Sequence, residues 1–234
     1  MSIGIIVATE YELTQTKKLL SNIKEYNHYN LTFYSGNIEN KNVVIVKCGI
    51  GKVNAARTTQ VLIDKFKIDF IINLGAAGAL NPDLNVKDIV IGEKLVQYDF
   101  DLSELDNVKK GEIQGIGRYI RSDEKLIKIC KKALSKICDS DFNYILGTIG
   151  TADFFCADSS KAIEIREEFN VDCVEMEGCA IAQVCLLDKV PFIIIRGISD
   201  TQNENNKIDY YTYCEAASEQ AANLIKEFIA CLTK

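Results

Sequence analysis

The chain has 234 residues, of which 47% are hydrophobic and 26% are charged. These proportions match globular domains and exclude a disordered, collagen-like or coiled-coil protein, so we predict a single domain over residues 1–234. The longest apolar runs, such as residues 190–195, are far shorter than the roughly 18 residues that a membrane span needs. The N-terminus lacks the basic segment and cleavage motif of a signal peptide, which predicts a cytoplasmic protein.

Charge and residue counts narrow the class of function. The 27 basic and 33 acidic residues give a net charge of −6, and the basic residues are dispersed, which disfavours nucleic acid as a partner. The nine cysteines show no C-x-x-C spacing and mostly occupy apolar segments, so we interpret them as reduced core residues. With His28 as the single histidine, neither a multi-histidine metal site nor a Ser-His-Asp relay is expected.

Short β-rich runs alternate with helical patterns along the chain, which is typical of an α/β structure with a buried, largely parallel sheet. Strands are predicted at residues 3–7, 31–36, 42–48, 70–74, 88–101, 144–150, 172–174 and 191–196. Helices are predicted at residues 11–20, 53–66, 122–137, 158–169, 177–187 and from about residue 213, and Ser122 is the expected N-cap of the third. Residues 31–48 look like a hairpin, which makes the sheet mixed. We predict a three-layer α/β/α fold with a mixed central sheet.

Two glycine segments follow predicted strands. The segment at residues 49–52 fits neither nucleotide-loop pattern, because Val46 and Val53 break the Walker spacing and Asn54 replaces the third glycine of a dinucleotide fingerprint. We interpret it as a tight strand-to-helix turn. The segment at residues 75–78 has only small side chains, which would let a ligand approach the backbone beyond the strand. A binding role and a structural role both remain open there.

Carboxylates follow three of the predicted strands: Glu10 and Glu12, Glu175 and Glu177, and Asp200. At those positions they would project into a crevice beyond the ends of the strands. The alternative for each is a helix terminus, where an acid in the first turn gains about 0.3–1 kcal/mol from the helix dipole.

A cation and two aromatic side chains stand near the same strand ends. Arg196 either forms a structural ion pair or is placed for an anion or a polarised water. Phe154 and Phe155 are either core residues or stack on a flat base. Several carboxylates around an apolar, aromatic crevice suit the cleavage of a glycosidic bond, whose cation-like transition state needs a general acid, a carboxylate near the sugar and a base for water.

The same residues carry a family resemblance over nearly the whole chain. The chain resembles the 5′-methylthioadenosine/S-adenosylhomocysteine nucleosidases of the purine nucleoside phosphorylase superfamily. The matching segments are residues 3–12, 49–56, 71–78, 174–177 (Val-Glu-Met-Glu) and 196–200 (Arg-Gly-Ile-Ser-Asp), and the last two are the most specific. The resemblance implies a nucleoside phosphorylase/hydrolase-like domain that hydrolyses the N-glycosidic bond of these two nucleosides.

The resemblance also implies roles for individual residues. Asp200 would protonate N7 of the leaving adenine, Glu12 would be the base or positioner for water, and Arg196 would assist it. The implied substrate contacts are Glu177 and Met176 at the ribose, Phe155 stacked on the purine, the Cys156 backbone at the base edge, and Glu175, Ala76, Gly78 and Ser199 around them. No metal or organic cofactor is implied, and the expected assembly is a homodimer in which the partner covers the 5′ substituent.

Three departures from the family pattern leave alternatives open. Ala76 stands where many members have serine, Tyr98 replaces a usual histidine, and residues 103–117 lack the usual aromatic and glycine-rich stretch. The 5′ preference is therefore open, and futalosine or another modified nucleoside is an alternative substrate. A phosphorolytic enzyme would need a basic phosphate site where the chain carries Glu10 and Glu12. A silent nucleoside-binding module would lack the acid or the base, and both Asp200 and Glu12 are present.

Overall fold

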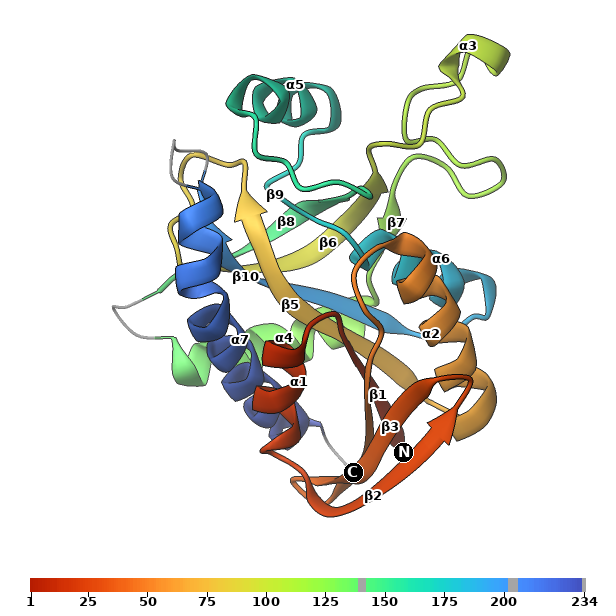
Figure 1. Ribbon diagram of the computed structural model, residues 1–234, viewed down its shortest axis with the longest axis vertical. Helices are drawn as coiled ribbons and strands as arrows, with labels where there is room; N and C mark the ends of the chain where they lie inside the picture. Colours follow the sequence, from red (N-terminus) through yellow and green to blue (C-terminus); the bar gives the residue numbers. More distant parts are fainter. Residues whose placement is uncertain (139–141, 202–205, 233–234) are drawn as a thin grey trace.

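A ten-stranded mixed sheet forms the centre of the computed structural model, which describes residues 1–138, 142–201 and 206–232 (Figure 1). Its strands in chain order are β1 (Ser2–Val7), β2 (Ser21–His28), β3 (Leu31–Ile38), β4 (Lys41–Lys47), β5 (Phe70–Ala79), β6 (Ile89–Gln97), β7 (Ile120–Arg121), β8 (Tyr144–Thr151), β9 (Cys173–Glu175) and β10 (Phe192–Asp200). The single domain predicted from the sequence is a proposal that this continuous sheet supports.

Pairing of the strands closes part of the sheet on itself. β5 lies between β1 and β10 and is parallel to both, while β10 also pairs antiparallel with β6. β6 pairs with β8, β8 with β9, and β9 returns to β5, so these five strands form a closed circuit. Residues near the ends of β5, β9 and β10 line one cavity together with residues that follow β1 and β8.

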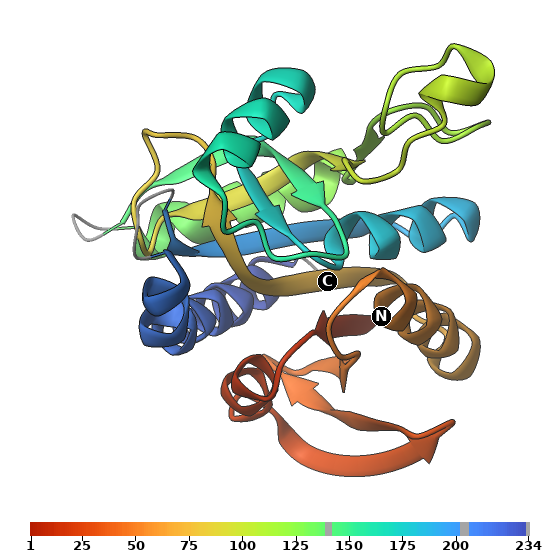
Figure 2. The same ribbon diagram turned by 45° about the horizontal axis from the view of Figure 1, so that its top comes forward.

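Helices cover both faces of the sheet, as Figures 1 and 2 show. One face packs on α1 (Glu10–Lys17), α4 (Glu124–Ile137) and α7 (Asn206–Cys231), and the other on α2 (Lys52–Phe66) and α6 (Gly178–Leu187). The side chains of β1 alternate accordingly, since Ile3 and Ile5 join the first core and Ile6 joins the second. α5 (Ser159–Phe169) covers a third apolar cluster, and the short α3 (Ser103–Asp106) projects away from the sheet (Figure 2). The α/β/α prediction with a mixed sheet is confirmed.

Several predicted element boundaries are wrong. β2 has no counterpart in the sequence prediction, because as an exposed edge strand it shows no apolar alternation. β5 and β10 continue to Ala79 and Asp200, so residues 75–78 lie in a strand and not in a turn after it. α1 ends at Lys17 rather than Leu20, and α7 begins at Asn206 rather than near residue 213.

The N-cap of α4 is Asp123 rather than Ser122. The Asp123 carboxylate accepts hydrogen bonds from the backbone N–H groups of Lys125 and Leu126, which satisfies two of the donors at the start of the helix. Among the described residues, no helix has the length and apolar character that crossing a membrane would require.

Candidate active site

A cavity of about 420 Å³ lies at the ends of β1, β5, β9 and β10. It is lined by Ala8, Thr9, Glu12, Ile50, Ala76, Ala77, Gly78, Phe155, Ala157, Val174, Glu175, Met176, Glu177, Ser199 and Asp200. Nine residues of the predicted site therefore line the same cavity. Arg196 and Cys156 lie just outside this lining. A larger cavity of about 640 Å³, between the β5–β6 connection and α5, contains none of them.

Glu12 is fixed at the N-terminus of α1 by three backbone N–H groups. Its Oε2 accepts from Ala8 at 2.7 Å and from Thr9 at 2.9 Å, and its Oε1 accepts from Ala76 at 3.2 Å. The Thr9 N–H bond and the bond that the Glu12 N–H donates to the Thr9 hydroxyl oxygen form a capping box, so the helix-terminus alternative describes part of the role of Glu12. The bond to Ala76 also ties the carboxylate to β5 at the cavity wall. Glu10, by contrast, points to the surface and pairs with Lys47 at 2.6 Å.

Gly75 is required by the close approach of two charged groups. A Cβ at this position would lie 2.6 Å from Glu12 Oε1 and 3.3 Å from Arg196 Nη1. Any side chain there would therefore displace the carboxylate. The Ala76 position has no hydroxyl, so its contribution to Glu12 comes from the backbone.

Glu175 and Arg196 form a buried ion pair beneath the cavity. The Arg196 guanidinium donates to Glu175 Oε2 and, at 2.6 Å, to Asn73 Oδ1, and the side chain is only 1% exposed. Glu175 also accepts from the Thr151 hydroxyl and from the backbone N–H groups of Glu177, at 3.0 Å, and Gly178, at 2.6 Å. These contacts favour the structural interpretation of Arg196 as an ion pair that shapes the floor of the site.

Glu177 stands at the start of α6 and faces the glycine turn before α2. Its Oε1 accepts from the Gly51 N–H at 2.9 Å, and Gly51 has a φ of 99°, a conformation that favours glycine. Burial, followed by the charge of Glu175, raises the pKa of Glu177 to about 8, although Arg196 and the Gly51 N–H act in the opposite direction. A ligand that donates hydrogen bonds to the Glu177 carboxylate would restore part of the solvation that this group loses on burial.

Asp200 ends β10 beside Gly78 of β5. The Ser199 hydroxyl donates to Asp200 Oδ1 at 2.7 Å, and a Cβ on Gly78 would lie 2.8 Å from Oδ2. The side chain is buried, and the irregular pairing between Ile198 and Asp200 turns it towards the cavity. Ser199 thus orients the Asp200 carboxyl group in this structure.

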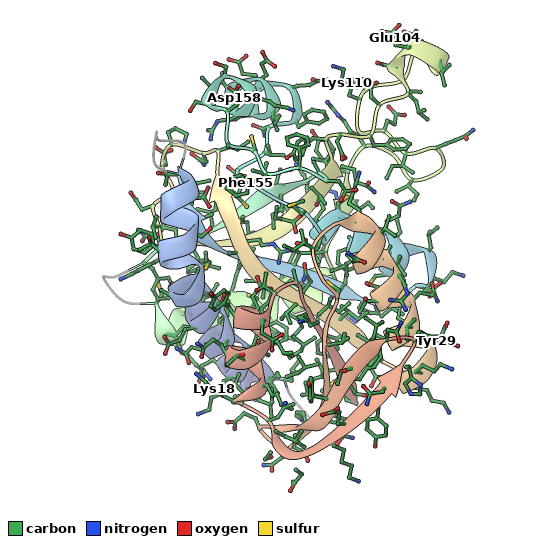
Figure 3. The ribbon with its side chains drawn as sticks, in the orientation of Figure 1. Lys18, Tyr29, Glu104, Lys110, Phe155 and Asp158 are labelled. Atoms are coloured by element: carbon green, nitrogen blue, oxygen red, sulfur yellow. The ribbon has the colours of Figure 1, made fainter. Side chains whose placement is uncertain are left out.

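The aromatic end of the cavity is formed by the loop from β8 to α5. Phe155, labelled in Figure 3, lines the cavity although its side chain is 45% exposed. Phe154 packs instead against Tyr98, with ring centroids 5.4 Å apart and planes at 90°. Cys156 is buried beside them and lines a smaller adjoining cavity. An exposed aromatic face at a cavity mouth is suited to stacking on a flat ligand.

Sequence reasoning missed a clamp around Lys52. Its ammonium contacts Asp99 Oδ1 at 2.6 Å, its backbone N–H donates to Asp153 Oδ1 at 2.8 Å, and the Asp153 N–H donates to Asp99 Oδ2 at 3.0 Å. These bonds join the start of α2, the end of β6 and the loop after β8. The partners are far apart in sequence, so no local pattern could reveal them.

No described cluster of three or more His, Cys, Asp or Glu side chains is arranged to hold a metal ion.

Comparison with known proteins identifies the family of this chain. The family model described as "Phosphorylase superfamily" matches residues 2–230. The chain belongs to this superfamily. A curated 5′-methylthioadenosine/S-adenosylhomocysteine nucleosidase from Anoxybacillus flavithermus is 35% identical over the full length of both chains.

Solved structures of this superfamily agree along the whole chain. The corresponding nucleosidase from Neisseria meningitidis, in complex with methylthio-immucillin-A, has a TM-score of 0.94 and 32% identity and covers 99% of both chains. Futalosine hydrolase of Helicobacter pylori has a TM-score of 0.93 and 28% identity, covering 99% of this chain and 98% of its own. The family resemblance drawn from the sequence motifs is confirmed.

Proposed function

We propose that this member of the phosphorylase superfamily hydrolyses the N-glycosidic bond of 5′-methylthioadenosine and S-adenosylhomocysteine, releasing adenine and the thioribose. The observation that carries the proposal is the placement of Glu12 and Asp200 on the same cavity, each held by specific hydrogen bonds. The nucleosidases named above support the choice of substrates.

The mechanism assigns one proton transfer to each of these two carboxyl groups. Asp200 donates a proton to N7 of the base while the bond between C1′ and N9 breaks and its electron pair leaves with adenine. Water then attacks C1′, and Glu12, held on its three backbone donors, takes the proton that this water loses. A positioned acid or base contributes about 10²–10⁴-fold.

The remaining lining residues hold the two halves of the substrate. Glu177 and Met176 contact the ribose. Hydrogen bonds from the ribose hydroxyls offset the burial that raises the pKa of Glu177, and the resulting carboxylate stabilises the positive charge that develops on the sugar. Phe155 stacks on the purine, and the Cys156 backbone meets its edge. Arg196, paired with Glu175, acts as a positioning residue under Glu12 and Gly75. The reaction as written needs no cofactor.

Charge in the cavity argues for water over phosphate as the nucleophile. No lysine or arginine is among the described residues that line it, and the nearby Arg196 is engaged by Glu175. A phosphate dianion beside the carboxylate of Glu12 would be repelled. Phosphorolysis is therefore the less favoured reaction.

The deciding experiment incubates the protein with methylthioadenosine, adenosylhomocysteine, adenosine, inosine and futalosine, each with and without phosphate. Hydrolysis predicts adenine and a free reducing sugar from the first two, at rates independent of phosphate. An obligatory phosphate and a sugar 1-phosphate product would establish the phosphorylase alternative. Preferred release from futalosine would assign the chain to the reaction named for the Helicobacter pylori neighbour. Binding without release would establish the silent module.

We also propose a homodimer, because α2, α6 and α3 lie on one side of the molecule (Figures 1 and 2) and each carries an exposed apolar side chain. Val53 is 78% exposed, Leu105 77% and Leu187 63%. Ile50 is also exposed and lines the cavity, so a partner on this side would cover the mouth of the cavity.

A cytoplasmic location is proposed as well; the nine cysteines, all in described segments, form no disulfide.

A further inference from the structure

A second, small cavity of about 30 Å³ adjoins the aromatic end of the main one. It is lined by Gly78, Tyr98, Phe154, Phe155, Cys156, Val174, Glu175, Met176 and Asp200. Six residues line both cavities, so the two adjoin: Gly78, Phe155, Val174, Glu175, Met176 and Asp200. A water molecule occupies about 30 Å³ in the liquid, so the small cavity has room for one polar group of that size.

The Tyr98 hydroxyl is buried in this region without a hydrogen-bond partner among the described residues. The side chain is 7% exposed, and its ring is fixed by an edge contact with Phe154 and by Phe169 at 6.2 Å. A buried hydroxyl without a partner is unfavourable and rare in native proteins. The neighbouring Tyr119 shows the usual arrangement, since its hydroxyl donates to the Phe169 carbonyl at 3.0 Å.

Tyr98 lines the small cavity together with Cys156 and Glu175. Burial raises the pKa of Tyr98. The hydroxyl therefore stays neutral at physiological pH and can accept a hydrogen bond as well as donate one. Folding alone leaves this capacity unused.

We propose that Tyr98 determines specificity for the leaving base: its hydroxyl forms a hydrogen bond with the amino group at C6 of the purine. The proposal rests on the proposed function, in which Asp200 acts at N7. In adenine, N7 and the 6-amino group lie on the same edge of the ring system. A base whose N7 meets Asp200 therefore directs its 6-substituent along the wall that Asp200 shares with the small cavity.

The test compares binding of adenine with binding of purine, which lacks the 6-amino group, to the wild-type protein and to Tyr98→Phe. The variant keeps the ring and its packing. We expect it to lower the preference for adenine over purine about three- to tenfold, the range for one neutral hydrogen bond. The matched control Tyr119→Phe removes a hydroxyl that is already bonded to the backbone, and it should keep the wild-type preference.

The stability of the ligand-free protein gives a second readout, in which the two variants should differ in the opposite sense: Tyr119→Phe and not Tyr98→Phe should be impaired. Removing an unpartnered hydroxyl should leave the melting temperature of Tyr98→Phe equal to or above that of the wild type, whereas Tyr119→Phe should lower it. An unchanged adenine-to-purine ratio in Tyr98→Phe would overturn the proposal. Base affinities are measured without turnover, so a wild-type protein that binds bases but releases none from nucleosides would refute the proposed function while the ratio still decides the role of Tyr98.

Discussion

At the scale of single residues, the buried carboxylates of the cavity differ in what compensates their charge. Glu12 has three backbone donors, and Glu175 has a guanidinium, a hydroxyl and two backbone donors. Among the described groups, Glu177 accepts one backbone hydrogen bond, from Gly51. Glu177 is thus the least compensated of the three, which agrees with its raised pKa. The contrast predicts different consequences for the same chemical change.

Glu12→Gln should lose both turnover and stability. An amide has one oxygen, so in either orientation its NH₂ group faces at least one of the N–H groups of Ala8, Thr9 and Ala76. We expect a 10²–10⁴-fold lower kcat, from loss of the base for water, and a loss of about 1–3 kcal/mol in the free energy of unfolding. Activity assays on fully folded protein and urea unfolding measure the two effects.

Glu10→Gln is the matched control for that variant. It lies two residues earlier on the same helix, and its exposed pair with Lys47 contributes about 0–1 kcal/mol. Its turnover should remain that of the wild type. Wild-type turnover in folded Glu12→Gln would remove Glu12 from the mechanism.

Glu177→Gln should change how stability depends on pH. The folded-state pKa of Glu177 is raised from 4.5 to about 8, so between these values the folded protein holds a proton that the unfolded chain has released. Its contribution therefore makes stability fall as pH rises through this window, by up to about 1.4 kcal/mol per pH unit. Urea unfolding at pH 5, 6.5 and 8 should show a flatter dependence in the variant. The exposed Glu167→Gln is the control, and equal slopes in Glu177→Gln and the wild type would contradict the burial argument.

At the scale of elements, the sequence predicts a segment well where burial of the segment requires a local run of apolar residues. β1 and the first half of β5 are apolar on both faces, so their runs are visible without any structure. The second half of β5 consists of small residues whose extension depends on pairing with β9 and β10. β2 is exposed along nearly its whole length and carries no apolar signal.

The same distinction holds for the candidate site. Glu12, Glu177 and Asp200 could be named because they directly follow apolar strands. The partners that hold them could not: Asn73 and Thr151 reach Arg196 and Glu175 across more than twenty residues of sequence, and the Gly51–Glu177 bond spans 126 residues. Such contacts arise from strand pairing rather than from local composition.

The Lys52 clamp provides a prediction at this scale. Its ion pair with Asp99 is only 19% and 21% exposed, and the adjacent Gly51 N–H holds Glu177. Lys52→Met should loosen the start of α2, raise KM about threefold or more and cost about 1 kcal/mol of stability, more than a surface pair would. Lys52→Arg should restore KM, which would separate loss of the cation from loss of packing.

Lys47→Met is the control for the clamp, because Lys47 pairs with Glu10 at the same 2.6 Å but with side chains that are 42% and 67% exposed. It should alter neither KM nor stability by a comparable amount. If both methionine variants behave alike, the clamp has no special connection to the site.

At the scale of the whole molecule, the cavity opens beside an exposed apolar surface. Ile50 belongs to both, since it lines the cavity and is 54% exposed. α3 and α6, which lie on the same side of the molecule as α2, carry the exposed Leu105 and Leu187. Exposed apolar patches mark interaction sites on soluble proteins. A second copy of the chain on this side would shield the substrate from solvent at the end away from the base.

Val53→Glu tests this assembly without threatening the fold. Val53 occupies the first turn of α2, where an acidic side chain interacts favourably with the helix dipole and where no acid is present now. The variant should therefore fold normally but place two buried charges at a symmetric interface. Sedimentation velocity should give twice the chain mass for the wild type and the chain mass for Val53→Glu, with reduced activity at low protein concentration. Ile163→Glu, on exposed α5 away from this surface, should remain dimeric. A wild-type monomer with full activity at assay concentrations would show that one chain completes the site by itself.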